Sequence, residues 1–302
     1  MNLQQLRYLR EIVRRDLNLT QAAAALHTSQ PGVSRQILEL EDELGIDVFV
    51  RKGRRIVGLT EPGRAALRIA ERMLHDLDGL KRVAADFAGD DTGILRIATT
   101  HTQARYTLPE TIAAFRRSFP RVSVVLRQSD PVVAVRRIIN GEADLAVATE
   151  QIASNRELLA LPYLEWTHVA VFPPGHPLED AEHFDLEMLA RHPLLTYDAA
   201  FTGRTSIDRA FANAGIEPDI AVSALDADVI KTYVRLGMGV GLIAAIAFDP
   251  AADRPLLARD CGELFGRRTS HVGLVRGRSV RRFVAEFVRI MLPDFDERQL
   301  DD

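Results

Sequence analysis

The sequence contains a single cysteine, Cys261, among 302 residues. One cysteine excludes an internal disulfide framework and any metal site with several cysteine ligands, so we expect a small, partly buried apolar residue rather than a redox sensor. No uninterrupted apolar run is long enough to cross a bilayer, and the N-terminus lacks the layout of a signal peptide. A cytoplasmic protein is therefore expected.

An excess of positive charge is also missing from the chain as a whole. The formal net charge is −4, which gives no overall indication of nucleic-acid binding. Basic side chains are concentrated locally instead, because the segment from Arg51 to Arg72 holds seven Lys or Arg residues and two Glu. Such a segment on an acidic protein is typical of a DNA-reading module joined to another domain, although any one arginine could belong to an ordinary solvated surface.

The pattern that organises the chain lies between Leu19 and Leu44, where two short helices joined by a tight turn are predicted. Thr20 is the expected N-cap of an alanine-rich first helix, and Ser29 or Gln30 begins the second. The second helix has one apolar face, formed by Val33, Ile37, Leu40 and Leu44. The other face carries hydroxyls, amides and a guanidinium, from Ser29, Gln30, Ser34, Arg35 and Gln36. Such groups pair with base edges and phosphates in the major groove of DNA.

A short basic hairpin is predicted directly after these two helices. Gly45 ends the second helix, and residues 51–60 then form a hairpin whose tip surrounds Gly53. A basic hairpin beside a helix-turn-helix makes a wing that is suited to contact with phosphates or the minor groove. The two helices alone could also be an ordinary helical hairpin in a globular core, but the basic hairpin favours DNA binding.

Residues 1 to about 64 resemble the winged helix-turn-helix of LysR-type transcriptional regulators. The matching segments are LQQLRYL, AAAALHTSQPGVSRQILELEDELGIDVFVRKGR and LTEPGR. Double-stranded promoter DNA is therefore an expected partner. We expect DNA contacts from the turn and the second helix at Thr28, Ser29, Gln30, Ser34 and Arg35, with bases read by the last four of these. We expect phosphate contacts from the wing, at Arg51, Lys52, Arg54 and Arg55.

A long helix over residues 60–88 is predicted after the wing, with Thr60 and Pro62 at its start. Its apolar residues recur at alternating spacings of four and three, at Ala66, Ala70, Met73, Leu77, Leu80, Ala84 and Phe87. This heptad seam predicts either packing on the helix's own domain or self-association. We favour a dimerising linker helix, because helix-turn-helix regulators usually read two-fold sites as dimers. Residues 88–93 are the expected hinge.

From Gly93 onward, apolar strands alternate with helices in a parallel α/β layout. A helix over 104–118 belongs to the first set, a strand at 161–172 opens a second set, and a closing helix at 278–291 is expected to return to the first. Two linked lobes of this kind leave a cleft between them. Open α/β sheets bind their ligands at the carboxyl ends of the strands, next to helix N-termini.

Polar residues stand at several of these strand ends. The first strand runs into TTHTQAR at residues 99–105, the third ends at Thr149, and the segment 201–204 (FTGR) precedes a helix of the second lobe. Neutral donors beside helix N-termini favour a small anion or carboxylate. Any one threonine is more often a simple helix cap, but the cluster holds more donors than one cap needs.

Further segments resemble the effector domain of the CysB-like subgroup of LysR-type regulators, which control sulfur assimilation and cysteine synthesis. They are ATTHTQARYTLP, GEADLAVATE, FTGRTSIDRAF and DADVIKTYVRLGMGVGLIA. The resemblance implies an all-α winged helix-turn-helix with a long linker helix, followed by a two-lobe α/β effector domain of the periplasmic-binding-protein type II kind. It also implies that the effector, acetylserine or a sulfate-like anion, contacts Thr100, Thr102, Gln103, Thr149 and Thr202.

The same resemblance implies a division into three parts, namely a DNA-binding domain at 1–64, a linker helix at 65–91 and an effector domain at 92–302. Lobe I is expected at about 92–162 and 268–302, and lobe II at about 163–267. Self-association is expected to give a dimer through the linker helix, and the family resemblance points to a tetramer.

The chain shows few groups that could support catalysis or bind a metal. His101 has no second histidine or carboxylate at a supporting spacing, and Asp226 and Asp228 are expected to cap a helix. We therefore predict no catalytic residues, no metal site and no cofactor, and a regulator rather than an enzyme. The alternatives are a LysR-type regulator of another pathway with a different small anionic effector, or an enzyme on the same two-lobe fold.

Overall fold

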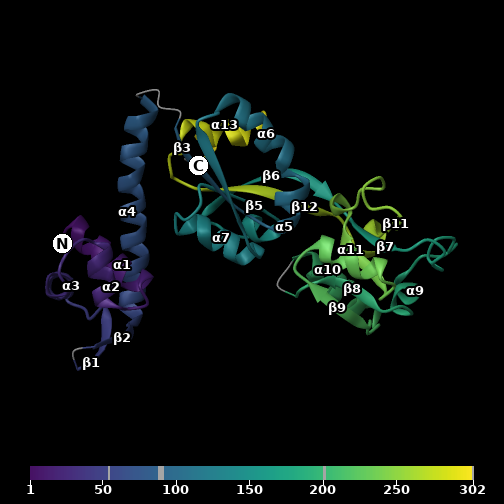
Figure 1. Ribbon diagram of the computed structural model, residues 1–302, viewed down its shortest axis with the longest axis horizontal. Helices are drawn as coiled ribbons and strands as arrows, with labels where there is room; N and C mark the ends of the chain where they lie inside the picture. Colours follow the sequence, from purple (N-terminus) through teal and green to yellow (C-terminus); the bar gives the residue numbers. More distant parts are fainter. Residues whose placement is uncertain (54, 88–91, 200–201, 301–302) are drawn as a thin grey trace. The chain divides into compact units, whose positions relative to one another are not determined.

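Figure 1 shows the computed structural model of the chain, in which residues 1–53, 55–87, 92–199 and 202–300 are described. Within these ranges, the description does not extend to the side chains of residues 75, 76, 78, 81–87, 150 and 202. The chain divides into two compact units, Met1–Asp90 and Asp91–Asp302. Each unit has its own buried apolar core.

The first unit contains the predicted pair of short helices and the predicted hairpin. Its elements are α1 (Leu3–Arg14), α2 (Leu19–Ala25), α3 (Gln30–Leu44), β1 (Phe49–Lys52), β2 (Arg55–Leu59) and α4 (Glu61–Phe87). The start of α3 is confirmed, because Ser29 Oγ accepts a hydrogen bond from the Gly32 amide at 3.2 Å. Its predicted end is also confirmed, because Gly45 adopts the left-handed conformation with φ 65°.

The cap of α2 differs from the prediction. The helix begins at Leu19, so Thr20 lies inside its first turn. Asn18 is the N-cap instead, and its Oδ1 accepts hydrogen bonds from the amides of Thr20 and Gln21, each at 3.1 Å. Asparagine is among the strongest N-cap residues, and here its side chain accepts from two otherwise free amides of the first turn, so the helix begins before Thr20.

A single apolar cluster holds the first unit together. Val33, Ile37 and Leu40 are fully buried on the inner face of α3, against Leu9 and Ile12 of α1. Complete burial of each such side chain contributes about 1.5–3 kcal/mol. Leu44, which was expected on the same face of α3, is exposed at the end of the helix. The buried stripe leaves the polar face of α3 available to solvent.

The long helix α4 starts as predicted and packs partly on its own unit. Thr60 Oγ1 accepts from the Gly63 amide at 2.9 Å, and a Cβ atom on Gly63 would lie 1.9 Å from the Val48 carbonyl oxygen, so only glycine fits this approach of the helix to the wing. Ala70 and Leu74 are buried in the core of the unit. In contrast, Ile69, Met73 and Leu80 are exposed apolar side chains on the same helix. The predicted seam residues Ala84 and Phe87 lie outside the described side chains.

The second unit contains two five-stranded sheets, and the first holds β4, β3, β5, β12 and β6 in that order. Their bounds are Val122–Gln128, Gly93–Thr99, Leu145–Ala148, Arg268–Val275 and Leu158–Trp166. β3 runs parallel to β4 and β5, whereas β12 is antiparallel to β5 and β6. The helices of this sheet are α5 (His101–Tyr106), α6 (Leu108–Ser118), α7 (Pro131–Ile139), α8 (Glu150–Ala153) and α13 (Arg282–Met291). We call this sheet with its helices the first lobe.

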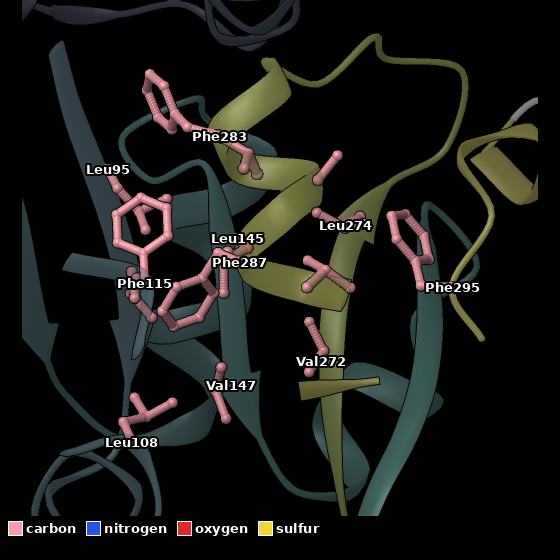
Figure 2. Close-up of a cluster of buried hydrophobic side chains, with 14 of the residues drawn as sticks. Leu95, Leu108, Phe115, Leu145, Val147, Val272, Leu274, Phe283, Phe287 and Phe295 are labelled. Atoms are coloured by element: carbon pink, nitrogen blue, oxygen red, sulfur yellow. The ribbon is translucent and has the colours of Figure 1, made fainter. Parts of the chain in front are cut away.

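Buried side chains cover both faces of this first sheet. Leu145 and Val147 point into one cluster together with Phe115 of α6 and Phe283 and Phe287 of α13 (Figure 2). The rings of Phe115 and Phe287 meet edge to face, with centroids 5.4 Å apart. The alternate strand positions, Ala146 and Ala148, join a second cluster with α7 and α8. The predicted return of the closing helix to the first lobe is confirmed by α13.

The second sheet holds β11, β7, β10, β8 and β9 in that order. Their bounds are Leu257–Asp260, His168–Phe172, Val240–Ala244, Leu194–Tyr197 and Ile220–Ala224. One face is covered by α9 (Leu186–Ala190), α10 (Thr202–Ala214) and α12 (Gly262–Phe265). The other face is covered by α11 (Ala227–Arg235) and the 3-10 turn η1 (Ala245–Ala247). We call this sheet with its helices the second lobe.

Two predicted elements had wrong boundaries, and one strand was missed. The strand expected at 161–172 is two strands, because β6 ends at Trp166 in the first lobe and β7 begins at His168 in the second; both are apolar, so no composition change marks the crossing. The helix expected at 104–118 is broken at Thr107 into α5 and α6, and Pro109, which lacks an N–H, stands in the first turn of α6. The edge strand β11 was not predicted, because its LARD sequence has little apolar character.

Cys261 lies in the core of the second lobe and is fully buried. Burial raises the pKa of its thiol to about 12, so the reactive thiolate is scarce at neutral pH. The expected role as a small apolar residue is confirmed, and the burial is more complete than expected. None of the described helices is long and apolar enough to cross a membrane.

Candidate effector pocket and DNA-binding surface

A small cavity lies between the two lobes of the second unit, at the carboxyl ends of their parallel strands. The first lobe lines it with Thr100, Thr102, Gln103, Pro131, Thr149 and Trp166, and the second lobe with Tyr197, Gly203 and Ala244. The cavity has a volume of about 40 Å³. Since roughly 10–15 Å³ of such volume holds one water molecule, the space matches a group of a few heavy atoms.

The structure brings together four of the five residues that the resemblance assigns to the effector. Thr100, Thr102 and Gln103 come from the junction of β3 and α5, and Thr149 follows β5, which pairs with β3. The side chain of the fifth, Thr202, lies outside the described residues, and its neighbour Gly203 lines the cavity. These donors converge because parallel strands end at the same edge of a sheet.

Thr100 also has the simpler role of a helix cap. Its Oγ1 lies 3.5 Å from the Gln103 amide nitrogen at the start of α5. This distance is at the outer limit of a hydrogen bond, so the cap does not saturate the hydroxyl. Thr99, which was not singled out from the sequence, is fully buried and donates to the Val147 carbonyl at 2.8 Å, which ties β3 to β5 behind the pocket.

The amide of Gln103 is held in one orientation by neighbours from distant parts of the chain. Gln103 Nε2 donates to Ser270 Oγ at 2.8 Å, and Trp166 Nε1 donates to the same oxygen at 3.1 Å. The hydroxyls of Thr107, at 2.7 Å, and Tyr163 are hydrogen-bonded to Gln103 Oε1. Burial raises the pKa of Tyr163 to about 12, so its hydroxyl stays protonated. One Nε2 hydrogen of Gln103 is left to point toward a ligand.

The second lobe contributes a buried phenol to the pocket. Tyr197 OH accepts a hydrogen bond from the Ala244 amide at 3.1 Å and interacts with the Thr102 side chain of the other lobe. Burial raises its pKa to about 12, so it is neutral. Among the described side chains that line the pocket, none is ionised at neutral pH. The site therefore offers an anion hydrogen-bond donors but no counter-charge.

The sequence offered no partner for His101, and the structure corrects that expectation. Ligand atoms of His101, Asp226 and Asp228 lie within 4.8 Å of one another, a set that could hold a divalent metal ion. Asp226 is the N-cap of α11, as predicted, and accepts from the Val229 amide at 2.9 Å. Asp228 does not cap; it forms an ion pair with Arg105 at 2.6 Å, which leaves less of its charge for a metal.

The polar face of α3 is available on the first unit. Thr28, Ser29, Gln30 and Arg35 are exposed, and Ser34 is half-buried. Arg35 Nε contacts Glu39 Oε1 at 2.9 Å, but the arginine side chain is 81% exposed, so this i,i+4 pair is weak and a phosphate or base edge could replace it. The predicted contact residues of the turn and of α3 thus share one accessible face.

The wing residues divide into two kinds. Lys52 and Arg55 are exposed near the hairpin tip, and Arg54 lies outside the described residues. Arg51 differs, because its Nη2 lies 2.7 Å from Oε2 of the buried Glu41. The other oxygen, Glu41 Oε1, accepts from two amides at the start of the wing, those of Val48 at 2.8 Å and Phe49 at 3.0 Å. The structure thus places Arg51, predicted as a phosphate contact, in an internal ion pair that joins α3 to the wing.

Comparison with known families agrees with this arrangement of two units. Residues 3–64 match the model described as "Bacterial regulatory helix-turn-helix protein, lysR family", and residues 88–296 match the LysR substrate binding domain. The chain belongs to the LysR family. Together the two models cover most of its length, including both the α3 surface and the pocket.

Similar LysR-family proteins match over almost their entire length. The chain is 49% identical to the HTH-type transcriptional regulator SsuR of Burkholderia cenocepacia, over 99% of this chain and 97% of that protein. It is also 49% identical to the HTH-type transcriptional regulator CysB of the same organism, over 100% of this chain and 96% of that protein. A crystal structure of the cofactor-binding domain of the Cbl transcriptional regulator is 42% identical, with a TM-score of 0.66, over 70% of this chain and 92% of that one.

Proposed function

We propose that this LysR-family protein is a cytoplasmic, DNA-binding transcription regulator whose pocket binds a small anion of sulfur metabolism, and that it controls genes of sulfur assimilation and cysteine synthesis. The proposal is supported by the similarity to proteins named CysB and SsuR along the whole chain. These relatives are named as transcriptional regulators, so the chain is a regulator and not an enzyme.

The convergence of uncharged donors at one small cavity carries the proposal for the effector. Thr100, Thr102, Gln103 and Thr149 line a space of about 40 Å³, which is the size of a sulfate-like group. A ligand with a free ammonium group would find no carboxylate among the described lining side chains. The chemistry therefore favours sulfate, or an acetylserine whose amino group is acylated, with Thr202 of α10 as a fifth contact.

The exposed face of α3 and the wing support the proposal for DNA. Ser29, Gln30, Ser34 and Arg35 are the proposed readers of bases, with Thr28 beside them, and Lys52, Arg54 and Arg55 are the proposed contacts to phosphates. Arg51 is proposed to hold the wing in place through Glu41.

Self-association through α4 completes the proposed regulator. The exposed apolar side chains Ile69, Met73 and Leu80 follow one stripe at spacings of four and seven, as a coiled-coil seam requires. A dimer joined there would present two copies of α3 to a two-fold DNA site. The proposed division is a DNA-binding domain at 1–64, a linker at 65–91 and an effector domain at 92–302, with assembly continuing to a tetramer.

A footprint titration tests the gating of DNA binding by the effector. Labelled promoter DNA is titrated with the full chain at fixed salt, with and without sulfate or acetylserine, and thermal shift is measured in parallel. A ligand that binds the folded protein raises its stability by an amount that grows with the logarithm of ligand concentration above Kd. It changes DNA binding only if the two arrangements of the protein bind it with different affinity. An unchanged footprint and affinity at every effector concentration would rule out gating.

A further inference from the structure

Helix α5 contacts the second lobe through a face that the pocket does not use. Its N-terminal residues, Thr102 and Gln103, line the cavity. Its last two residues, Arg105 and Tyr106, reach across to α11 of the other lobe. The helix has only six residues, and it is separated from α6 at Thr107. The donors that face the ligand and the groups that touch the second lobe are therefore parts of one short, rigid piece.

The phenol of Tyr106 occupies a site of fixed charge in the second lobe. It donates a hydrogen bond to Asp228 Oδ1 at 2.7 Å and accepts one from Lys231 Nζ at 3.1 Å. Both hydrogen-bonding directions of the hydroxyl are thus used. Hydrogen bonds to charged groups are the stronger ones, so this contact is worth more than a neutral pair.

The side chain of Lys231 is fixed in this position by further hydrogen bonds. The residue is only 3% exposed, and its ammonium also donates to the Ala247 carbonyl at 2.8 Å and to Asp253 Oδ2 at 2.9 Å. Asp253 is itself buried and is bonded by Arg235 at 3.1 Å. The groups of the second lobe that bind the Tyr106 hydroxyl are therefore already held in place by hydrogen bonds within that lobe.

Packing and charge act together at this contact. The ring of Tyr106 packs against the buried cluster of the second lobe that contains Ile230. Burial of the Asp228 carboxylate opposes its ionisation, but the hydrogen bond from Tyr106 and the charges of Lys231 and Arg105 outweigh this and lower its pKa. The Arg105 side chain is 58% exposed, so its ion pair with Asp228 adds little, and the phenol carries the contact.

We propose that Tyr106, Asp228 and Lys231 are positioning residues that anchor α5 to the second lobe and thereby set the geometry of the effector pocket. The proposal rests on the proposed function of that pocket. Without the anchor, Thr102 and Gln103 would move with α5, and the donors of the two lobes would no longer face one anion. Ligand affinity then depends on residues that never touch the ligand.

Hydrogen exchange measures the anchor without any ligand. The full-length Tyr106→Phe and Asp228→Asn proteins are compared with wild type by mass spectrometry of peptides that cover residues 101–107. Loss of a hydrogen bond between a neutral and a charged group predicts about tenfold faster exchange in α5. Matched controls make the same chemical changes elsewhere on the second lobe, namely Tyr233→Phe on the outer side of α11 and Asp185→Asn at the cap of α9. Equal exchange in the anchor and control variants would overturn the proposal.

Titration calorimetry with sulfate and with acetylserine then measures the consequence for the pocket. We expect both anchor variants to bind about tenfold more weakly, the double variant to bind no more weakly than either, and the controls to bind as wild type does. An additive loss in the double variant, or an unchanged affinity in either single variant, would contradict the anchor. If wild type binds neither probe, the proposed effector class is wrong, while faster exchange in α5 still supports the anchor; the two failures are therefore distinct.

Discussion

The proposed DNA-binding surface and the proposed effector pocket are both suited to anions, yet their chemistry differs. On the first unit, Arg35, Lys52 and Arg55 are exposed and keep their charges in water. In the second unit, Thr100 and Gln103 are buried and neutral. Exposed charges attract a polyanion at long range and release counterions, so their effect depends on salt. Buried neutral donors act only at contact, and their effect depends on geometry.

The difference follows from the cost of burying charge. A cation in the small cavity between the lobes would have to be desolvated before any ligand arrived, whereas hydroxyl and amide donors cost far less to bury. The charges near the pocket are instead paired with one another, as Lys231 is with Asp253. The same reasoning applies to Glu41 in the first unit, whose buried carboxylate accepts hydrogen bonds from two backbone amides and forms an ion pair with Arg51. Buried charge in this protein holds its structural elements in place, and we propose that the exposed cations of the first unit contact DNA.

The largest expected effect is that of Glu41→Ala, which tests whether the buried charge of the first unit is structural. The change leaves the amides of Val48 and Phe49 and the guanidinium of Arg51 without their acceptor. Removing one partner of a buried pair costs about 4 kcal/mol of unfolding free energy. Urea unfolding followed by helical circular dichroism measures the loss, and hydrogen exchange of peptides 46–52 locates it in the wing.

The DNA affinity of Arg51→Gln sharpens this prediction. If Arg51 only supports the wing, affinity falls while the salt dependence keeps the wild-type slope, because no phosphate contact is lost. The slope in question is that of the logarithm of affinity against the logarithm of salt concentration. A slope that is shallower by about 0.9 would instead indicate that Arg51 contacts a phosphate, and Arg51 would then not be a purely structural charge.

The second-largest effect concerns His168, a fully buried histidine behind the pocket. Burial, helped by the nearby charge of Arg268, lowers its pKa from 6.5 to about 4. The pKa of His168 is lower in the folded protein than in the unfolded chain, so protonation favours unfolding. The free energy of unfolding is therefore not reduced by this group above pH 6.5, and it falls as the pH falls toward 4. Between pH 7 and pH 5 the unfolding free energy should fall by about 2 kcal/mol on this account.

Trp166, the single tryptophan, lies in the second unit, so its fluorescence reports unfolding of that unit. Its ring is also close to the histidine in question, with centroids 5.1 Å apart. His168→Gln should remove this part of the pH dependence, whatever it does to stability at pH 7. A variant with the full wild-type pH dependence would show that another group titrates.

A smaller effect is expected in the pocket itself. Gln103→Leu keeps the size of the side chain but removes the amide that Ser270, Thr107 and Tyr163 hold in place. Effector affinity should fall by about 1.5 kcal/mol, or roughly tenfold, through loss of one charge-assisted hydrogen bond. Isothermal titration with sulfate measures this, with salt varied as a control. Affinity in a neutral pocket should change little with ionic strength, and a steep salt dependence would break the contrast with the DNA surface.

The smallest effects separate the two kinds of DNA contact. Arg55→Gln should weaken binding to all sequences by about 1 kcal/mol and make the salt slope shallower by about 0.9. Gln30→Ala should leave the slope unchanged and reduce the ratio of specific to non-specific affinity. Fluorescence anisotropy on specific and scrambled DNA at several salt concentrations distinguishes them. An equal loss of specificity in both variants would contradict this division of roles.

Local signals in the sequence predicted the first unit almost completely. The turn, the α3 cap at Ser29, the end at Gly45 and the wing are set by neighbouring residues and by the period of the apolar side chains. The error at the start of α2 was also local, since Asn18 was passed over as a cap. The effector residues proposed in the first lobe rest on the family resemblance, and they follow strands that the sequence predicted.

Tertiary structure decided everything that joins segments far apart in the chain. Gln103 and Ser270 are 167 positions apart and Tyr106 and Asp228 are 122 positions apart, and no pattern in the intervening sequence relates the two ends. The same holds for the approach of His101 to two carboxylates. No local signal indicates the passage of the chain between lobes at Thr167 or the pairing of Arg51 with Glu41 either, although these join nearby segments. Hydrophobic periodicity and capping act over one or two turns, so they determine which elements form. Which side chains meet depends on how the sheets pack and where their strand ends coincide, and only the folded chain determines that.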